Sequence, residues 1–505
     1  MATATAGPAS PPDLARQDVR VVMAGLLTLV LLVALDQTVM ATALPRIAQQ
    51  LGGLDRYSLA VAAFLLPGTA AMPLYGKAID VHGPRPVLAV AGGLFVTGSL
   101  LCGLSQTMDQ LVWARGLQGL GAGGLVTLAF TVTFLIAPPA DRPVFQSLFG
   151  VTFSVASLAG PLAGGALAEQ WRWLFLANVP LGLAAVGAVG WVLRRVPAQR
   201  RGGPLDRPGA VLLLAAALLW LAAISWACTT LPLRSLRLGG LLTAAAAVTV
   251  VLLVHEKNAV DPILPLRLFR DRTFALTSLA AALLGGVLFG GVLFLPLYLQ
   301  LVRGTTPTVS GLAMVPMMVA VVAASVLSAR VIGRTGRFRV ILITGAALVT
   351  GGTALASALD RTSPPALIAA ALLLLGAGLG MCMQNLIVVA QSSLPPHQIG
   401  AGTSLTTFSR QLGASLGVAL LGALLNAQWT DRLNSALTAS GRADSPSAEQ
   451  LLQAHGSPAD PLVIDAFLSS FRMTMLAATA LAALLITVCV AIPHRHLPQR
   501  PAQPS

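Results

Sequence analysis

Long runs of apolar residues, separated by short polar segments, limit most strongly what this chain can fold into. A helix needs about 20 mostly apolar residues to cross a bilayer, and the 505-residue sequence contains fourteen such runs. Only 10% of its residues are charged, against roughly a quarter in ordinary soluble domains. The sequence therefore predicts an all-α integral membrane protein with spans near residues 21–43, 57–77, 87–106, 111–136, 144–168, 173–193, 209–228, 238–254, 274–300, 309–329, 340–358, 365–390, 402–427 and 468–492.

The basic residues predict the orientation of these spans, because cytoplasmic loops carry an excess of Lys and Arg. With the N-terminus inside, the inner segments hold 20 of the 32 basic residues and the outer segments hold nine. The net charge of +14 falls between apolar runs and not along one face, so nucleic acid is excluded as a partner. We expect both termini in the cytoplasm, as tails over residues 1–20 and 493–505, with an uncleaved first span.

A faint internal repeat predicts the domain organisation. Three glycine pairs recur at an offset of 253 residues, which corresponds to eight spans, as expected for a transporter made of duplicated halves. We predict two six-helix bundles over 21–193 and 273–492, an inserted pair of spans with its loops over 194–272, and a long outer loop over 428–467. The pairs are Gly83 with Gly336, Gly160 with Gly413, and Gly164 with Gly417.

Asp36 is the carboxylate that falls well inside a predicted span. An acid at mid-helix costs about 2.5–3.5 kcal/mol on insertion scales, so it indicates function by default. Burial favours the protonated form of a carboxyl group, and a carboxyl that meets water on alternate sides could carry protons across. The alternative is a structural acid paired with Arg115 or with a hydroxyl such as that of Thr38.

Arg115 lies near the outer end of the fourth predicted span. Its charge is effectively permanent, so close to Asp36 it would respond when that acid is neutralised. The alternative is an interfacial arginine that extends to the outer headgroups. We interpret Asp36 and Arg115 as the proton-coupling pair.

Two stretches have the composition of gating elements. The cytoplasmic loop from Gly76 to Pro86 mixes charges with turn formers and could lock two halves through helix ends, although a solvated turn would look similar. The fifth span has glycines and a proline that allow close packing and bending, although most such patterns are packing faces. The candidate gating residues are Gly76, Asp80, Gly83, Arg85, Gly160, Pro161, Gly164 and Gly165.

Scattered polar residues inside apolar spans predict a cavity for amphiphilic organic molecules. We find no ring of acids typical of a channel, and no phosphate-binding loop for ATP. The four cysteines, Cys102, Cys228, Cys382 and Cys489, lack metal-ligand spacing, so we expect neither a metal nor a cofactor, with protons as the coupling ion. The candidate cavity residues are Gln37, Thr38, Gln118, Tyr298, Gln300, Gln384, Asn385 and Arg410.

Seven strings in the expected order resemble motifs of the major facilitator superfamily, specifically its fourteen-span drug:proton antiporters. The resemblance covers nearly the whole chain, and it implies a major facilitator fold of 6+2+6 spans with Asp36 as the proton site. The strings are Leu35 to Val39 with Ala43 to Pro45, Gly76 to Arg85, Arg115 with Gln118 and Gly119, Gly160 to Gly165, Trp171 to Trp173 with Asn178 to Pro180, Leu295 to Gln300, and Arg410 to Gly413.

The chain departs from the family pattern in two ways. Val81 and Pro84 stand where the loop motif usually carries basic residues, which puts the strength of that lock in doubt. The additional acids of relatives that export divalent cations are absent from the later spans. Because a dication paired with Asp36 alone would leave one charge unsatisfied, we expect monovalent, neutral or zwitterionic substrates.

The sequence and the resemblance together predict a transporter, not an enzyme, that exports drugs, antibiotics or biocides in exchange for protons by alternating access. We expect it to act as a monomer in a bacterial cell membrane. One alternative is a proton-coupled importer of a nutrient or siderophore on the same fold. Another is a membrane enzyme or receptor, but that would need a cluster of reactive side chains near one membrane face.

Overall fold

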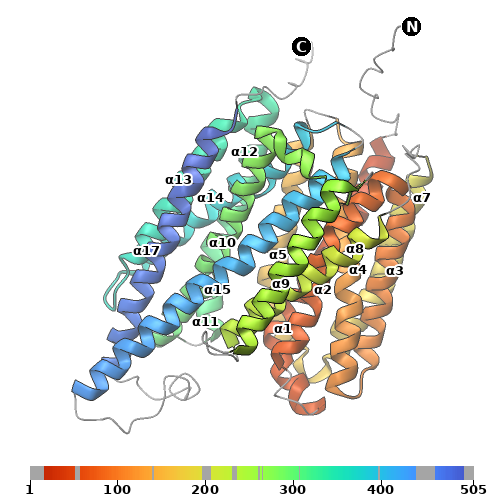
Figure 1. Ribbon diagram of the computed structural model, residues 1–505. Helices are drawn as coiled ribbons and strands as arrows, with labels where there is room; N and C mark the ends of the chain where they lie inside the picture. The colour runs from red at the N-terminus through yellow and green to blue at the C-terminus, as the bar shows by residue number, and fades with distance from the viewer. Residues whose placement is uncertain are drawn as a thin grey trace.

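The computed structural model describes residues 16–51, 57–138, 141–195, 206–229, 236–259, 262–263, 265–305, 307–395, 398–439 and 461–493. Every regular element in this part of the chain is a helix (Figure 1), and the short 3₁₀ helices among them are named η here. The elements are α1 (Arg16–Leu51), α2 (Tyr57–His82), α3 (Pro84–Leu104), α4 (Met108–Ile136), α5 (Arg142–Ala166), η2 (Ala168–Gln170), α6 (Arg172–Leu176), α7 (Asn178–Val192), η3 (Leu193–Arg195), α8 (Arg207–Thr229), α9 (Leu236–Asn258), η4 (Leu266–Arg270), α10 (Arg272–Leu301), α11 (Pro307–Leu312), α12 (Val315–Thr335), α13 (Phe338–Ser357), α14 (Pro365–Ser392), α15 (Ile399–Ala439) and α17 (Pro461–Ala491).

The helices follow the apolar runs of the sequence. Each of the fourteen predicted segments lies on helices, the sixth being divided between α6 and α7 and the tenth between α11 and α12. Ten helices of the described chain are long and apolar enough to cross a membrane. Two shorter apolar helical stretches, Pro208–Trp220 and Arg272–Leu288, accompany them. The predicted all-helical membrane fold is therefore confirmed.

The outward faces of the helices are apolar as well. On α3, Leu88, Ala91 and Phe95 are buried at helical spacing, whereas Val90 and Leu101 on other faces are exposed. A helix that is apolar on every side is suited to a position between protein and lipid tails. The exposed apolar side chains of α3 therefore fit a lipid-facing surface.

The buried apolar side chains form two large cores, one in each half of the chain. One core is built from α1 to α7 together with Ile387 of α14, and the other is built from α10 to α17. Figure 1 shows these halves as the warm-coloured and cool-coloured groups of helices. Ile387 belongs by sequence to the second half and by packing to the first, so the two halves are in direct contact.

Glycines allow close helix packing inside each half. On α4, an added Cβ at Gly119 or Gly123 would collide with the backbone carbonyls of Phe64 and Gly68 on α2. In the second half, a Cβ at Gly413 of α15 would collide with the Ala282 carbonyl of α10. Packing of this kind holds helices together where lipid removes the usual hydrophobic drive.

Helices of the first half pack directly against helices of the second half. α2 packs against α15, and α5 packs against α12 and α14. α8 packs against its partner α9 and also contacts α2 and α15, so the inserted pair lies over one of these contacts between the halves (Figure 1). Motion of one half against the other must therefore involve α8.

Several sequence-predicted boundaries differ from the structure; for example, α1 continues to Leu51, beyond the predicted end of the first span at 43. The predicted loop over 428–467 is wrong at both ends, because α15 continues to Ala439 and α17 already begins at Pro461. The ring centroids of Trp429 and Phe467 lie 5.6 Å apart, edge to face, which stabilises these helical extensions. Residues 440–460 lie outside the described residues. At the N-terminus, α1 begins at Arg16, within the predicted tail.

Candidate functional site

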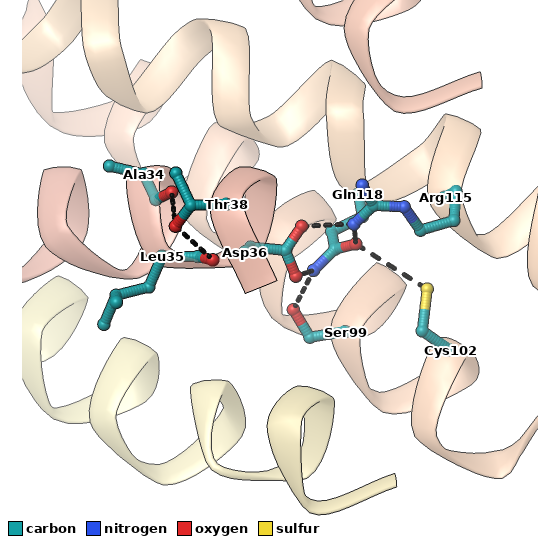
Figure 2. Close-up of polar contacts among 8 residues, drawn as sticks. All are labelled: Ala34, Leu35, Asp36, Thr38, Ser99, Cys102, Arg115 and Gln118. Carbon is teal, nitrogen blue, oxygen red and sulfur yellow. Dashed lines mark hydrogen bonds and ion pairs between the residues drawn. The ribbon is translucent and has the colours of Figure 1, made fainter. Parts of the chain in front are cut away.

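Asp36 of α1 and Arg115 of α4 form an ion pair inside the first half (Figure 2). Asp36 is 6% exposed and Arg115 is 1% exposed, so both charges are withdrawn from solvent. Arg115 Nη1 donates to Asp36 Oδ2. A buried charge is strongly destabilising without its partner, so each of these residues requires the other.

Gln118 completes the pair from one turn further along α4. Its Nε2 donates to Asp36 Oδ1 at 2.9 Å and to Ser99 Oγ at 2.9 Å. Its Oε1 accepts from Arg115 Nη1 at 2.8 Å and lies 3.6 Å from Cys102 Sγ. The side chain that the sequence assigned to the substrate cavity is therefore engaged, at both amide atoms, in the charge network.

Ser99 and Cys102 of α3 are members of this network that the sequence did not suggest. They are three residues apart, so they lie on one face of α3, and both are fully buried. A serine and a cysteine in an apolar span are common, and only their position opposite Gln118 distinguishes them. The described cysteines Cys102, Cys382 and Cys489 are free thiols, and the side chain of Cys228 lies outside the described residues.

Aromatic rings surround the rest of the Arg115 guanidinium. Its Cζ atom lies 4.1 Å from the ring centroid of Phe64 and 5.9 Å from that of Phe175. Such cation–π contacts stabilise a cation only modestly compared with a carboxylate partner. Arg115 is thus held by a carboxylate, an amide and two aromatic rings.

The next residues of α1 connect the pair to α5. Thr38 Oγ1 donates to the Ala156 carbonyl of α5 at 3.0 Å. One turn further along α5, a Cβ at Gly160 would collide with the Thr38 side chain, so glycine permits the α1–α5 contact. Gln37, between Asp36 and Thr38, is exposed. The other residues of the predicted fifth-span stretch, Pro161, Gly164 and Gly165, lie near the end of α5.

The loop stretch joins the two halves where α2 ends and α15 begins, at the side that the sequence predicts to be cytoplasmic. Asp80 accepts hydrogen bonds from the backbone N–H groups of Gly400, at 2.8 Å, and Ala401, at 2.7 Å. These groups belong to the first turn of α15, where the helix dipole also favours a negative charge. Added Cβ atoms at Gly76 or Gly400 would collide across the same contact. The end of α2 and the start of α15 are therefore held together.

The turn after α2 explains two further residues of the loop. Gly83 has φ of 84°, a backbone conformation that L side chains rarely adopt, and Pro84 follows it as the first residue of α3. Gly336, its counterpart at the offset of 253 residues, also has a positive φ, of 66°. Arg85 is exposed beside this turn.

The candidate cavity residues of the second half do not gather around Asp36. Tyr298 is fully buried, stacks on Phe471 with ring centroids 5.2 Å apart and donates to the Asp360 carbonyl at 2.7 Å. In this structure Tyr298 belongs to the apolar core of the second half. Gln300 Nε2 donates to Ser310 Oγ at 2.9 Å.

The remaining candidates occupy α14 and α15. Arg410 is half-buried on α15, and its Nε has no hydrogen-bond partner within the described residues. Gln384 and Asn385 are buried on α14, where this helix contacts α5 and α12. Among the described residues, no group of three or more His, Cys, Asp or Glu side chains could hold a metal ion.

Comparison with known proteins gives a consistent result. The family model of the Major Facilitator Superfamily matches residues 26–418. An uncharacterized MFS-type transporter of Mycobacterium tuberculosis is 36% identical over 461 residues, which are 89% of this chain and 66% of that relative. The chain thus spans slightly less than two thirds of this relative. The multidrug transporter protein MdtP of Bacillus subtilis is 30% identical over 408 residues, which are 80% of this chain and 75% of MdtP.

Solved structures with the same fold have much lower sequence identity. The human organic anion transporter MFSD10 aligns with a TM-score of 0.60 and 18% identity, over 92% of this chain and 99% of MFSD10. The proton:xylose symporter XylE aligns with a TM-score of 0.59 and 15% identity, over 92% of this chain and 95% of XylE. At these identities the likeness concerns the fold alone.

Proposed function

The chain belongs to the Major Facilitator Superfamily, and we propose that it is a proton-coupled antiporter that exports small amphiphilic organic compounds by alternating access. The buried Asp36–Arg115–Gln118 network carries this proposal. Asp36 supplies the intramembrane carboxylate that proton coupling requires. When this carboxylate takes up a proton, Arg115 loses the negative charge that it pairs with. The names of relatives such as the multidrug transporter MdtP support export over import.

The proposed cycle begins with the inner side closed, the conformation in which Asp80 and Gly400 are in contact. A proton that reaches Asp36 from outside neutralises the carboxylate and releases Arg115. The first half then moves against the second, the inner ends separate, and the proton leaves inward while substrate binds. One charge moved through 100 mV is worth ~2.3 kcal/mol, so a tightly coupled proton sustains a roughly 50-fold gradient of a neutral substrate.

The membrane arrangement that we propose contains fourteen spans as six, two and six. The bundles cover 21–193 and 273–492, and the inserted pair with its loops covers 194–272. Both termini are placed in the cytoplasm of a bacterial cell, and the protein works as a monomer with neither metal nor cofactor. The substrates are monovalent, neutral or zwitterionic drugs, antibiotics or biocides, because Asp36 alone cannot neutralise a dication.

Transport in everted membrane vesicles tests the proposal. Addition of a substrate should dissipate a preformed proton gradient in vesicles with the wild-type protein and not in vesicles with the Asp36→Asn variant. The matched control is Asp18→Asn, because Asp18 is another carboxylate of α1 and pairs with Arg195 at 2.9 Å near the inner surface. Proton-driven export that survives in Asp36→Asn as well as in Asp18→Asn would disprove the proposed role of Asp36.

A further inference from the structure

Gln391 and Gln146 join the two halves at the inner end of the contact between α5 and α14. Gln391 Nε2 donates to Thr403 Oγ1 at 2.7 Å and to the Phe130 carbonyl at 3.3 Å. Its Oε1 accepts from Gln146 Nε2 of α5 at 3.5 Å. Both amide atoms of Gln391 therefore have partners, and they connect α14 to α4, α5 and α15.

A second group of polar side chains lies further from the inner end and lacks such partners. Gln384 is two turns before Gln391 on α14, or about 10 Å along the helix. It is 2% exposed, and neither its Oε1 nor its Nε2 has a hydrogen-bond partner in the described part of the chain. The same holds for Ser325 Oγ of α12 and for Asn385 Oδ1, which are equally buried.

Gly150 of α5 brings these groups together. A Cβ added to Gly150 would lie 3.0 Å from Ser325 Oγ and 3.6 Å from Gln384 Cγ. Asn385 is held from the other side, because its Nδ2 donates to Ser328 Oγ at 3.0 Å and to the Met381 carbonyl at 2.7 Å. Ser325 Oγ and the Gln384 side chain thus lie where α12 and α14 of one half face a glycine of the other half, and Asn385 follows Gln384 on α14.

The chemistry of these atoms defines what could satisfy them. A buried donor or acceptor without a partner is costly, whereas a well-placed ligand group removes that cost. Gln384 supplies a donor and an acceptor, Ser325 supplies a hydroxyl, and Asn385 supplies a carbonyl oxygen. None of the three side chains carries a charge. They match a neutral group that both donates and accepts hydrogen bonds, such as an amide or a hydroxyl.

We propose that Ser325, Gln384 and Asn385, opposite Gly150, form a subsite for a neutral hydrogen-bonding group of the transported molecule. This inference rests on the proposed export function and adds to it a preferred substrate chemistry. The subsite is separate from the proton site. Ala156, which accepts from Thr38 beside Asp36, is six residues from Gly150 on α5, or about 9 Å along the helix. Separation of the inner ends exposes the subsite to the cytoplasm, from which the substrate comes.

Binding of two probes to the purified full-length protein tests the subsite. Chloramphenicol is neutral and carries amide and hydroxyl groups, whereas tetraphenylphosphonium is a lipophilic cation without a hydrogen-bonding group. Gln384→Leu and Ser325→Ala should each weaken chloramphenicol binding about tenfold in equilibrium dialysis and leave tetraphenylphosphonium binding unchanged. Equal effects on both probes, no effect on either, or wild-type protein that does not bind chloramphenicol would overturn the proposal.

Thermal stability separates a ligand site from a structural amide. Gln384→Leu should keep or raise the Tm, because it removes unpartnered polar atoms from a buried position. The matched variant Gln391→Leu should lower the Tm, because it removes the hydrogen bonds that Gln391 makes with Thr403, Gln146 and the Phe130 carbonyl. A Tm of Gln384→Leu that falls as far as that of Gln391→Leu would assign Gln384 a structural role and contradict the subsite.

The vesicle assay with Asp36→Asn distinguishes failure of the subsite from failure of the export proposal. If Asp36→Asn abolishes proton-driven export while Gln384→Leu leaves both binding constants unchanged, the subsite is wrong and the transport mechanism stands. If Asp36→Asn remains fully coupled, the transport mechanism is wrong, and the subsite, which rests on it, falls as well.

Discussion

Asp80 at the end of α2 accepts a hydrogen bond, 2.8 Å long, from the backbone N–H of Gly400 at the start of α15. The two residues are 320 positions apart in the sequence and belong to opposite halves of the molecule. Because hydrogen bonds to a charged acceptor are stronger than those between neutral groups, this contact stabilises the conformation in which the inner ends are closed.

Asp80→Asn should shift the protein toward the conformation with separated inner ends. The substitution removes the negative charge at the α15 N-terminus and one acceptor, which we expect to cost about 1–2 kcal/mol, or roughly a tenfold change in the ratio of conformers. Distances between spin labels on the inner ends of α2 and α15 measure that ratio. Arg85→Gln is the control from the same loop, since Arg85 is exposed. Distance distributions that coincide for Asp80→Asn and the control would show that the contact is incidental.

Gly76→Ala should open the same inner contact by a steric route. The added methyl group would collide with the backbone carbonyl of Gly400 and the side chain of Ser404. Because a backbone atom cannot move aside as a flexible side chain can, α2 must separate from α15. Gly93→Ala on α3 is the matched control, because a Cβ there would meet nothing within 4 Å. Spin-label distances should lengthen in Gly76→Ala and stay at the wild-type values in Gly93→Ala.

Gln118→Leu tests whether Gln118 serves the charge network or the substrate. Leucine removes the hydrogen bonds to Asp36 and Ser99 and the acceptor for Arg115, so we expect a loss of about 1–3 kcal/mol in stability. The maximal rate of proton-coupled transport should fall while KM for the substrate stays unchanged. Gln106→Leu, at an exposed position in the turn between α3 and α4, should alter neither quantity. A raised KM with an unchanged maximal rate would show instead that Gln118 contributes to substrate binding, as the sequence predicted.

Much of the architecture could be predicted because it follows from local physics. Each apolar run of about 20 residues forms a helix, since a chain in lipid must satisfy its backbone hydrogen bonds internally. The cost of an isolated charge in an apolar span likewise predicted that Asp36 needs a partner, and the structure places Arg115 there. The limits of α15 and α17 were missed because Trp429 and Phe467 extend these helices through a contact between them.

The polar residues of the spans could not be sorted by sequence, because their roles depend on how neighbouring helices are rotated. Gln118, Tyr298 and Gln384 are all polar residues in apolar runs. Gln118 donates a hydrogen bond to Asp36, and Tyr298 donates one to the Asp360 carbonyl. Neither amide atom of Gln384 has a hydrogen-bond partner within the described chain. Ser99 gained its place in the network only through the packing of α3 on α4. These differences arise between helices and leave no pattern along one of them.

Asp206 fastens α8 to α9, and this contact leads to a pH-dependent prediction. Burial alone would raise the pKa of Asp206, but hydrogen bonds from the Gly209 N–H and the His255 ring, together with the charges of His255 and Lys77, lower it below the usual value. His255 Nε2 of α9 lies 2.9 Å from Asp206 Oδ2. The carboxylate therefore connects the start of α8 to α9 and lies within the electrostatic reach of α2.

Asp206→Asn should lower the Tm at pH 7 by a few degrees. A carboxyl whose pKa is lower in the folded protein than in the unfolded chain contributes stability above the unfolded pKa of about 3.9, and loses it as the pH falls through the folded pKa. The difference in Tm between wild type and variant should therefore be present at pH 5 and shrink below about pH 4. Thermal unfolding in detergent at a series of pH values measures it. A difference that stays constant down to pH 3 would show that Asp206 acts through hydrogen-bond geometry that asparagine cannot reproduce, and not through its charge.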